Sequence, residues 1–365
     1  MVVLMTILSI SLMSSLLALL VVLADKFLNS YGECSIDINN GSRTLKVQGG
    51  TSLLSALSSQ KIFIPSACGG KATCGLCKVE IINGAGMLLP TEEPYLTAEE
   101  IKAGIRLSCQ VKVKRDLKIS IPDELFSIRQ FKTKVARITK MTHDIKEFEL
   151  ILPQSDEITF KAGQYIQVDT KPYAKVKETA SRAYSISSIP SSRDRLEIIV
   201  RQVPGGICTT YLNQYLKEGD ELVLSGPYGD FYLREEGREL VLIAGGSGLA
   251  PIKSIILDVL LKNLDRQMTF FFGAVTRKDL YYVDYFRELE KQHSNFRFIP
   301  ALSKPEPEDA WDGEIGLITE VVEKYVNGAN DKGAYLCGSP GMINACLNVL
   351  KNIGFADDMI YYDKF

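Results

Sequence analysis

The amino end of the chain is a long apolar stretch that runs from Val2 to Ala24 and contains no charged residue. As a helix rising about 1.5 Å per residue, it is long enough to cross a hydrocarbon core of about 30 Å. A cleaved signal peptide usually has a basic segment before a shorter apolar core, and a buried core helix is amphipathic, so neither fits. The pattern predicts a single-pass membrane anchor over residues 1–25, in contact with lipid through residues 2–24. The flanking cation Lys26 favours the cytoplasmic side for the remaining domains.

A compact α+β domain is predicted over residues 33–125. Two stretches of alternating apolar and polar residues flank the sequence NNGS, which is typical of a hairpin turn. Thr51 is a candidate N-cap for a short helix, and Thr97 with Glu100 fits a capping box at a second helix. The alternating pattern returns over residues 107–121.

Two further domains follow from a change in the pattern. Over residues 130–235, short strands broken by Gly and Pro indicate an antiparallel barrel. Over residues 238–365, apolar strands alternate with amphipathic helices, which is typical of a parallel sheet covered on both faces. The fold class is therefore α+β and α/β, in a multidomain protein.

Composition excludes several classes of function. The net charge is -2, with 42 Lys and Arg against 44 Asp and Glu, whereas nucleic-acid binding needs a basic surface. Two histidines leave little scope for a histidine-built metal site. Eight cysteines in 365 residues are too sparse for a small disulfide-rich scaffold.

Four cysteines form the first candidate site, and they are Cys68, Cys74, Cys77 and Cys109. Four thiolates are the ligand set of a [2Fe–2S] cluster, two for each iron. The neighbouring glycines allow the backbone to wrap closely, so that N–H groups can point at the sulfurs. Structural zinc is the alternative, although its sites usually contain two CxxC-type pairs and this segment has one. A redox disulfide between Cys74 and Cys77 would need neither of the other two cysteines.

The sequence RAYSIS at residues 182–187 is the second candidate site. Arg182 could pair with a pyrophosphate, and Tyr184, two residues further along a strand, emerges on the same face and could stack on a flavin ring. A polar barrel strand without a ligand explains the same residues equally well. The third candidate is AGGSGLAP at residues 244–251, where glycines between a strand and a helix would admit a phosphate to the helix N-terminus.

These motifs resemble known families. The cysteine loop resembles ferredoxin-type [2Fe–2S] domains, with five residues between the first two cysteines instead of the plant-type four. RAYS resembles the R-x-Y-S flavin motif of the ferredoxin–NADP reductase superfamily, and GGICTTYL its second FAD motif. The resemblance implies a β-grasp ferredoxin domain, an FAD-binding barrel and a Rossmann-like NAD domain. It also implies FAD contacts from Arg182, Ala183, Tyr184, Ser185, Gly206, Ile207, Cys208 and Thr209, with Ser185 near flavin N5.

The same superfamily has a G-x-G-x-x-P nucleotide loop and a C-G-x-P-x-M motif, both of which this chain matches. The resemblance implies that Cys337 lies near the nicotinamide, although a small buried hydrophobic residue would explain that cysteine too. It further implies that the carboxyl-terminal aromatic Phe365 covers the flavin. Tyr184, Ser185, Cys337 and Phe365 are thus the catalytic candidates. The implied nucleotide contacts come from Gly246, Gly248, Pro251, Gly338, Pro340 and Met342.

The order of the four segments resembles the F subunits of Na+-translocating NADH:quinone reductases. The resemblance implies an electron path from NADH to FAD, to the [2Fe–2S] cluster, to partner subunits of a membrane redox complex and finally to quinone. It places the chain at the inner (cytoplasmic) membrane. Arg277 and Lys278 could accept the 2′-phosphate of NADPH, whereas Asp279 and the resemblance favour NADH.

Two alternatives stay open at this point. The barrel motif RQVPGGICTTYL also resembles soluble reductases that supply electrons to phenol and aromatic-ring oxygenases, and another ion-linked membrane complex is possible. The second alternative is a non-catalytic electron carrier or assembly scaffold, which would have the same folds but would not oxidise NADH. The terminal acceptor, the coupled ion and the partner subunits do not follow from the sequence.

Overall fold

The computed structural model describes residues 2–28, 31–262 and 264–364, with some side chains of the first helix left out. The chain divides into two compact units, Met1–Ile128 and Arg129–Phe365, and each is described by itself.

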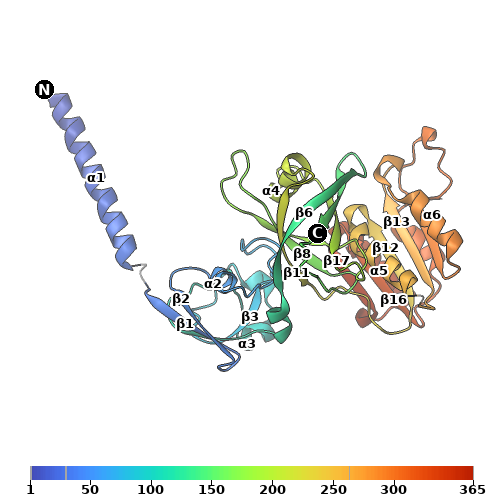
Figure 1. The fold of residues 1–365 in the computed structure, drawn as a ribbon, viewed down its shortest axis with the longest axis horizontal. Helices are drawn as coiled ribbons and strands as arrows, with labels where there is room; N and C mark the ends of the chain where they lie inside the picture. Colours follow the sequence, from blue (N-terminus) through green and yellow to red (C-terminus); the bar gives the residue numbers. More distant parts are fainter. Residues whose placement is uncertain (1, 29–30, 263, 365) are drawn as a thin grey trace. The chain divides into compact units, whose positions relative to one another are not determined.

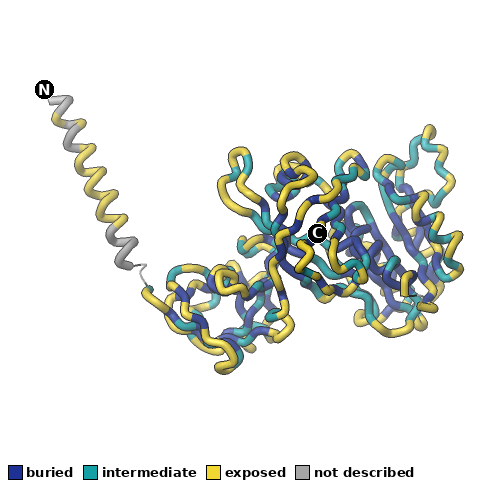
Figure 2. The backbone as a smooth tube through the Cα atoms, in the orientation of Figure 1, coloured by how far each residue is buried: buried dark blue, intermediate teal, exposed yellow. Residues whose placement is uncertain are grey.

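The amino-terminal helix is α1, Val2–Leu28. The described part of this helix is exposed (Figure 2), and Met13 and Leu17 are among its exposed residues. Over the residues that the structure describes, none of the helices combines the length and the apolar character needed to span a membrane. The predicted helix is therefore present, whereas its predicted membrane-spanning character is not supported.

The rest of the first unit is built on a five-stranded sheet with the order β2-β1-β5-β3-β4. Its strands are β1 Glu33–Ile38, β2 Arg43–Gln48, β3 Lys78–Asn83, β4 Ile105–Leu107 and β5 Leu117–Ser120. Its helices are α2 Leu53–Ser59, η1 Glu93–Tyr95, α3 Ala98–Lys102 and η2 Asp123–Ser127. Asn39 and Asn40 have positive φ in the hairpin turn after β1, as the sequence NNGS predicts. The capping box of Thr97 and Glu100 is confirmed.

The second unit begins with a six-stranded antiparallel sheet with the order β10-β7-β6-β11-β8-β9. Its elements are β6 Arg129–Lys140, β7 Ile145–Ile151, β8 Tyr165–Asp169, β9 Ser181–Ser185, β10 Arg195–Arg201, α4 Ile207–Thr210, η3 Tyr211–Tyr215 and β11 Glu221–Tyr228. A bridge between Ile186 and Ile198 brings the two edges of this sheet together. The predicted barrel is therefore present, around a core that includes Phe148, Ile166 and Leu224.

A six-stranded parallel sheet with the order β15-β14-β13-β12-β16-β17 completes the second unit (Figure 1). Its strands are β12 Glu239–Gly245, β13 Met268–Ala274, β14 Phe296–Leu302, β15 Glu314–Ile315, β16 Lys332–Gly338 and β17 Ile360–Lys364. Its helices are η4 Gly246–Gly248, α5 Leu249–Leu261, η5 Arg277–Asp279, α6 Val283–Gln292, η6 Pro307–Asp309, α7 Ile318–Tyr325, α8 Pro340–Ile353 and η7 Asp357–Met359.

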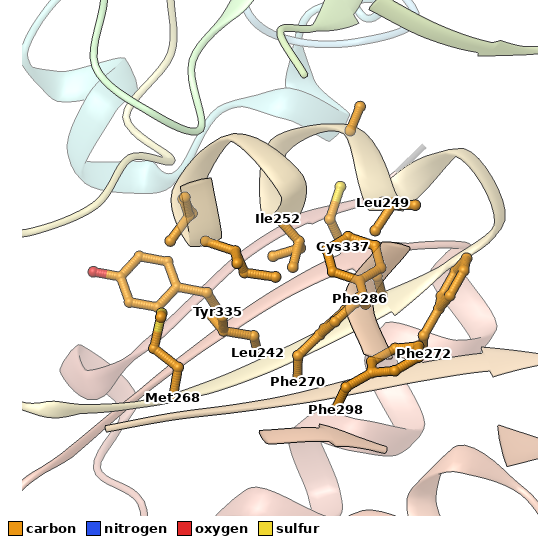
Figure 3. Packing of buried hydrophobic residues seen from close by; sticks show 14 of the residues in the cluster. Leu242, Leu249, Ile252, Met268, Phe270, Phe272, Phe286, Phe298, Tyr335 and Cys337 are labelled. Atoms are coloured by element: carbon orange, nitrogen blue, oxygen red, sulfur yellow. The ribbon is translucent and has the colours of Figure 1, made fainter. Parts of the chain in front are cut away.

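Alternate residues of these parallel strands enter two different cores. Leu242, Phe270 and Phe272 pack under α5 and α6 (Figure 3), whereas Ile243 and Phe271 pack on the opposite face, under α7 and α8. Because successive strand residues point to opposite faces, a strand covered on both sides needs a nearly continuous apolar run. The apolar pattern therefore correctly predicts a sheet covered on both faces.

Candidate functional site

The four predicted cysteines meet although Cys109 is far from the others in sequence. Cys77 lies directly before β3, and Cys109 follows β4 by two residues. The two strands pair with each other, and the N–H of Ser108 donates to the carbonyl of Cys77 at 2.8 Å. The irregular segment that carries Cys68 and Cys74 passes beside Cys109, since the backbone of Ala72 hydrogen-bonds Cys109 and a Cβ at Gly70 would lie 3.8 Å from the Cβ of Cys109.

The side chains of these cysteines interact in two pairs, Cys68 with Cys74 and Cys77 with Cys109. Within the described chain, no group of three His, Cys, Asp or Glu side chains is arranged to hold a single metal ion, and no disulfide joins the described cysteines. Two pairs of thiols match the ligand division of a [2Fe–2S] cluster, in which each iron takes two protein thiolates.

Hydrogen bonds prepare this loop for negative charge. Burial raises the pKa of the Cys68 thiol, but hydrogen bonds from the backbone of Thr73 and from Cys74 lower it to about 7. The hydrogen bond from Cys77 lowers the pKa of Cys109 to about 6. Burial raises the pKa of Cys74, and the hydrogen bond with Cys109 raises that of Cys77. One thiol of each pair is therefore favoured as a thiolate near neutral pH, and a set of four cysteines in two pairs fits the cluster.

The tight wrapping of the loop depends on Gly75. Its φ is +70°, and a Cβ at this position would lie 2.9 Å from Cδ1 of Tyr95. Any side chain here would combine backbone strain with a steric clash. The backbone around Gly75 is thereby held close to Cys74 and Cys77, where N–H groups can reach a bound anion.

Sequence reasoning missed two polar side chains beside the cysteine pair Cys77 and Cys109. Ser108 is 0% exposed, and its hydroxyl lies near the sulfur of Cys77, yet it completes no hydrogen bond with any described atom. Nε2 of Gln110 donates to Sγ of Cys109 at 3.7 Å. Their position directly beside Cys109 in sequence is the signal that could have identified them.

The predicted flavin strand is β9, which pairs with β8 so that Ile166 lies opposite Tyr184. Burial raises the pKa of the Tyr184 phenol well above its ordinary value, Cys208 raises it further, and the charge of Arg182 opposes the shift. Sγ of Cys208 in turn approaches the carbonyl of Ala180 at 3.4 Å. Arg182 and Tyr184 of the first predicted FAD motif therefore lie close to Cys208 of the second.

The second predicted FAD motif forms the short helix α4, which Gly206 precedes as N-cap without a side-chain cap. The hydroxyl of Tyr173 donates to the carbonyl of Ile207 at 2.7 Å, while Oγ1 of Thr209 accepts from the N–H of Val203 at 3.2 Å. These bonds fix the turn but leave the first N–H groups of α4 without a capping side chain, as binding of a pyrophosphate through backbone groups requires.

The glycine loop lies at the carboxyl end of β12. Gly246 has a φ of +56°, and Gly248 approaches β16 so closely that a Cβ would lie 2.2 Å from the carbonyl oxygen of Cys337. Pro251 is buried in the first turn of α5. The chain therefore needs glycine at position 248 for steric reasons, independently of any ligand.

The second nucleotide motif follows β16, next to this loop. Cys337 is fully buried and belongs to the core cluster of Figure 3. Burial raises the pKa of its thiol well above the ordinary value, with a smaller contribution from Asp363 opposite it on β17. A Cβ at Gly338 would lie 2.7 Å from Cε of Met342, and Pro340 begins α8. The structure thus brings Cys337, Gly338 and Met342 together beside Gly248.

The predicted aromatic Phe365 lies outside the described residues. The last described residues form β17, which pairs in parallel with β16. Two residues that the sequence did not indicate also reach the glycine loop. The hydroxyl of Tyr281 donates to the carbonyl of Gly246 at 2.9 Å, and the guanidinium of Arg201 lies 2.9 Å from the Cβ position of Gly246.

The strand order places this loop at a topological switch point. From β12 the chain proceeds outward through β13, β14 and β15, then returns to the other side of β12 as β16. In open parallel sheets, ligands bind outside the carboxyl ends of the strands where the order reverses, and dinucleotides are common there. Gly246, Gly248 and Gly338 occupy that position between β12 and β16.

Three family models match the three folded parts of the chain. Residues 36–114 match a 2Fe-2S iron-sulfur cluster binding domain, 132–232 an oxidoreductase FAD-binding domain and 242–348 an oxidoreductase NAD-binding domain. The chain is thus of the iron–sulfur flavoprotein class, with sites for [2Fe–2S], FAD and NAD. More particularly, it belongs to the family of the F subunits of Na(+)-translocating NADH-quinone reductases. Those of Neisseria meningitidis serogroup C and Histophilus somni are each 36% identical to it, over 96% of this chain and 96% of theirs.

Solved structures of other reductases have the same fold. The Amycolatopsis cytochrome P450 reductase GcoB is 28% identical, with a TM-score of 0.73 over 91% of this chain and 98% of that protein. The ferredoxin reductase in carbazole 1,9a-dioxygenase is 24% identical, with a TM-score of 0.70 and the same coverage.

Proposed function

We propose that the chain oxidises NADH and delivers the electrons, through FAD and a [2Fe–2S] cluster, to partner subunits of a Na+-translocating NADH:quinone reductase complex. The observation that carries this proposal is the presence of the flavin strand and the nucleotide loop in one compact unit, in a chain similar to F subunits along 96% of its length. Bound FAD would supply the capacity to take two electrons as a hydride and to give them up one at a time, and the cluster would supply one-electron transfer.

The residues of this chain would bind and orient the cofactors. Arg182 would pair with the FAD pyrophosphate, while Tyr184 would pack on the flavin ring and Ser185 would lie near its reactive nitrogen. The N–H groups of α4, in the segment that begins at Gly206, would bind the same pyrophosphate. Ala183 would contact FAD from the flavin strand. Cys337 would line the nicotinamide site together with Gly338, Pro340 and Met342.

We propose NADH over NADPH as the electron donor. Nζ of Lys278 is engaged with Oε2 of Glu306 at 2.9 Å, and the carboxylate of Asp279 accepts from the N–H and hydroxyl of Thr276. With Lys278 paired to an acid, a 2′-phosphate would have to compete with Glu306 for this cation. The ratio of kcat/KM values for the two nucleotides measures this preference, and a preference for NADPH would overturn it.

The direct test is an anaerobic visible spectrum of purified, detergent-solubilised protein before and after NADH is added. Flavin absorbance should bleach within the mixing time of a manual experiment, and iron and sulfide should be present at two atoms each per chain. Protein that contains FAD but does not bleach would support a non-catalytic carrier. Zinc in place of iron would contradict the cluster.

A second candidate is a reductase for an oxygenase, because GcoB and the carbazole dioxygenase reductase share the fold over 91% of this chain. The two candidates differ in their need for a membrane. We propose that α1 anchors the chain in the inner membrane, with domains at 33–125, 130–235 and 238–365 on the cytoplasmic side. Membranes of cells that express the full chain or a chain lacking residues 2–28 should be washed with sodium carbonate. Retention of the full chain alone supports the anchor, and loss of both contradicts it.

A further inference from the structure

A buried group of charges joins the barrel to the first helix of the nucleotide domain. Lys253 of α5 is 5% exposed, and its Nζ donates to Oε1 of Glu147 at 2.8 Å and to Oε2 of Glu197 at 2.9 Å. Glu147 lies on β7 and Glu197 on β10. A buried ammonium group persists only with such partners. Since Lys253 follows Pro251 by two residues, these bonds hold the helix that begins at the glycine loop.

The two carboxylates depend on the lysine. In the pairing of β7 with β10, Glu147 lies opposite Ile199 and Glu197 opposite Glu149, so Glu147 and Glu197 are diagonal neighbours on one face of the barrel. Like charges so placed repel each other. Lys253 lies between them and removes that repulsion, so a residue of the nucleotide domain completes this face of the barrel.

A strained tyrosine adds a third connection. Tyr282 has a φ of 61° and a ψ of 15°, in the left-handed region that bulky residues rarely adopt. Its hydroxyl donates to Oε2 of Glu147 at 2.7 Å, and Nζ of Lys253 lies 4.7 Å from the centre of its ring. The preceding residue, Tyr281, bonds the carbonyl of Gly246. Two adjacent side chains therefore connect the glycine loop with a carboxylate of the barrel.

The same helix is also bound to the segment that follows the flavin strand. Oγ of Ser254, which is fully buried, donates to the carbonyl of Ser188 at 2.6 Å. Ser188 follows Ser185, the last residue of β9, by three positions. The bonds of α5 to the barrel thus lie directly after the nucleotide loop on one side and directly after the flavin motif on the other.

Stability alone is a poor explanation for these charges. Desolvation of a buried ion pair largely offsets its attraction, and replacement by apolar residues is often neutral or stabilising. A strained Tyr282 adds a further cost. A buried ionic contact with well-defined geometry can instead fix one arrangement of the parts that it joins.

We propose that Lys253, Glu147, Glu197 and Tyr282 form an interdomain latch that positions the nicotinamide against the flavin. The latch residues act through the backbone of the glycine loop, and they are positioning residues for hydride transfer. The inference deepens the proposed function and depends on it. Misplacement of reacting atoms by about 1 Å can cost 100-fold in rate, so a small rotation of α5 would suffice.

The test is anaerobic stopped-flow reduction of bound FAD by NADH, using purified full-length protein with Lys253→Met. A series of NADH concentrations separates the limiting rate of flavin reduction from the apparent Kd for NADH. We expect the limiting rate to fall by about 10- to 100-fold. The apparent Kd should stay within about threefold, because the glycine loop itself is unchanged.

Lys262→Met is the matched control. Lys262 follows the same helix and pairs with Asp258 at 2.7 Å, but its side chain is exposed. This variant should reduce FAD at the wild-type rate. Tyr282→Phe removes the hydroxyl, with the bond that it donates to Glu147 and the one that it accepts from Nζ of Lys253 at 3.3 Å. It therefore tests the latch if Lys253→Met does not fold. It should lower the limiting rate by a smaller factor, about threefold to tenfold, with FAD content unchanged.

The outcomes separate the latch from the proposed function. If NADH fails to reduce FAD in the wild type, the proposed function is wrong. If the wild type is reduced and both variants keep its limiting rate, the latch is wrong. The variants could instead lose FAD or melt at a lower temperature, while the protein that retains FAD reacts at the wild-type rate. That result would show that these residues serve only stability, and it also overturns the inference.

Discussion

The ion pair of Arg106 and Glu92 in the cysteine-containing domain allows a quantitative test of the reasoning. Glu92 is 0% exposed and Arg106 is 8% exposed. Nε of Arg106 donates to Oε1 of Glu92 at 3.0 Å, and the guanidinium also bonds the carbonyls of Gly86 at 2.9 Å and Met87 at 3.0 Å. Arg106→Met removes all these bonds and leaves a buried carboxylate without its cation.

The expected loss follows from that burial. Breaking a buried pair by removing one partner costs about 3–5 kcal/mol. For a domain of 60–100 residues, each kcal/mol lowers Tm by about 4–8 °C, so the transition should fall by at least about 12 °C. The N–H groups of Leu89 and Leu107 still donate to Glu92, which favours the lower end of the range. The double variant Arg106→Met with Glu92→Leu should recover most of the loss, because it leaves no charge unpaired.

The assay is thermal unfolding of the full chain with its cofactors, followed by the visible absorbance of the cluster so that this domain is observed. Wild type, both single variants and the double variant form a double-mutant cycle. If Arg106→Met melts within about 4 °C of the wild type, the buried-charge argument fails. If the double variant is no more stable than the single one, the loss comes from backbone groups left without partners. These are the carbonyls of Gly86 and Met87 and the N–H groups of Leu89 and Leu107.

The same pair predicts a pH dependence. Burial raises the pKa of Glu92, but the hydrogen bonds from Arg106, Leu89 and Leu107 outweigh it, and the pKa is lower in the folded chain. The stabilisation is therefore fully present above the unfolded value of about 4.3 and is lost as the pH falls through the folded value. Glu92→Gln should be much less stable than wild type at pH 7, with the difference shrinking below about pH 4. A constant difference would contradict this assignment.

Two further predictions concern the cofactor sites. Ser108→Ala should lower the cluster reduction potential by about 59 mV, a tenfold shift in the one-electron equilibrium, because a hydroxyl near a cluster sulfur stabilises added negative charge. Ser187→Ala, which removes the other fully buried hydroxyl without a hydrogen bond among the described residues, should leave that potential unchanged in a redox titration. Gly248→Ala places a Cβ 2.2 Å from the carbonyl oxygen of Cys337 and should weaken NADH binding at least about tenfold, with FAD retained. Gly237→Ala, with nothing within 4 Å of its Cβ position, is the control, and equal NADH titrations of the two variants would refute the steric argument.

The sequence predicts the elements that depend on local pattern. Alternation predicts the barrel and the two-faced sheet because burial imposes a period on each strand. The cysteine pattern predicts a site of four thiols but not how they pair, and in the structure Cys68 interacts with Cys74 and Cys77 with Cys109. The predicted N-cap of α2, Thr51, is wrong by one residue, because Ser52 is the N-cap. Ser52 accepts from the N–H of Ser55, while the carbonyl of Thr51 accepts from Val113. The bond from Val113 keeps Thr51 in the extended segment before the helix, so the cap falls on the next hydroxyl, that of Ser52.

The connections between distant segments do not follow from local pattern. Glu147 and Lys253 are 106 residues apart, and each read alone is an ordinary surface charge. The left-handed conformation of Tyr282 contradicts the preference of its residue type, so only tertiary contacts could reveal it. The predicted extended segment 107–121 is divided between β4 and β5 because the chain turns after β4, where the N–H of Gln110 donates to the carbonyl of Leu107 at 2.8 Å.

The position of β5 in the sheet of the first unit has a consequence for synthesis of the protein. This last strand lies in the middle of the sheet, between β1 and β3. Translation therefore delivers three of the cysteines well before the strand that completes their domain, since domains fold as units once their sequence has emerged. The sheet that holds the four cysteines is complete only once Ser120 has left the ribosome, and until then their thiols are open to oxidants and to competing zinc.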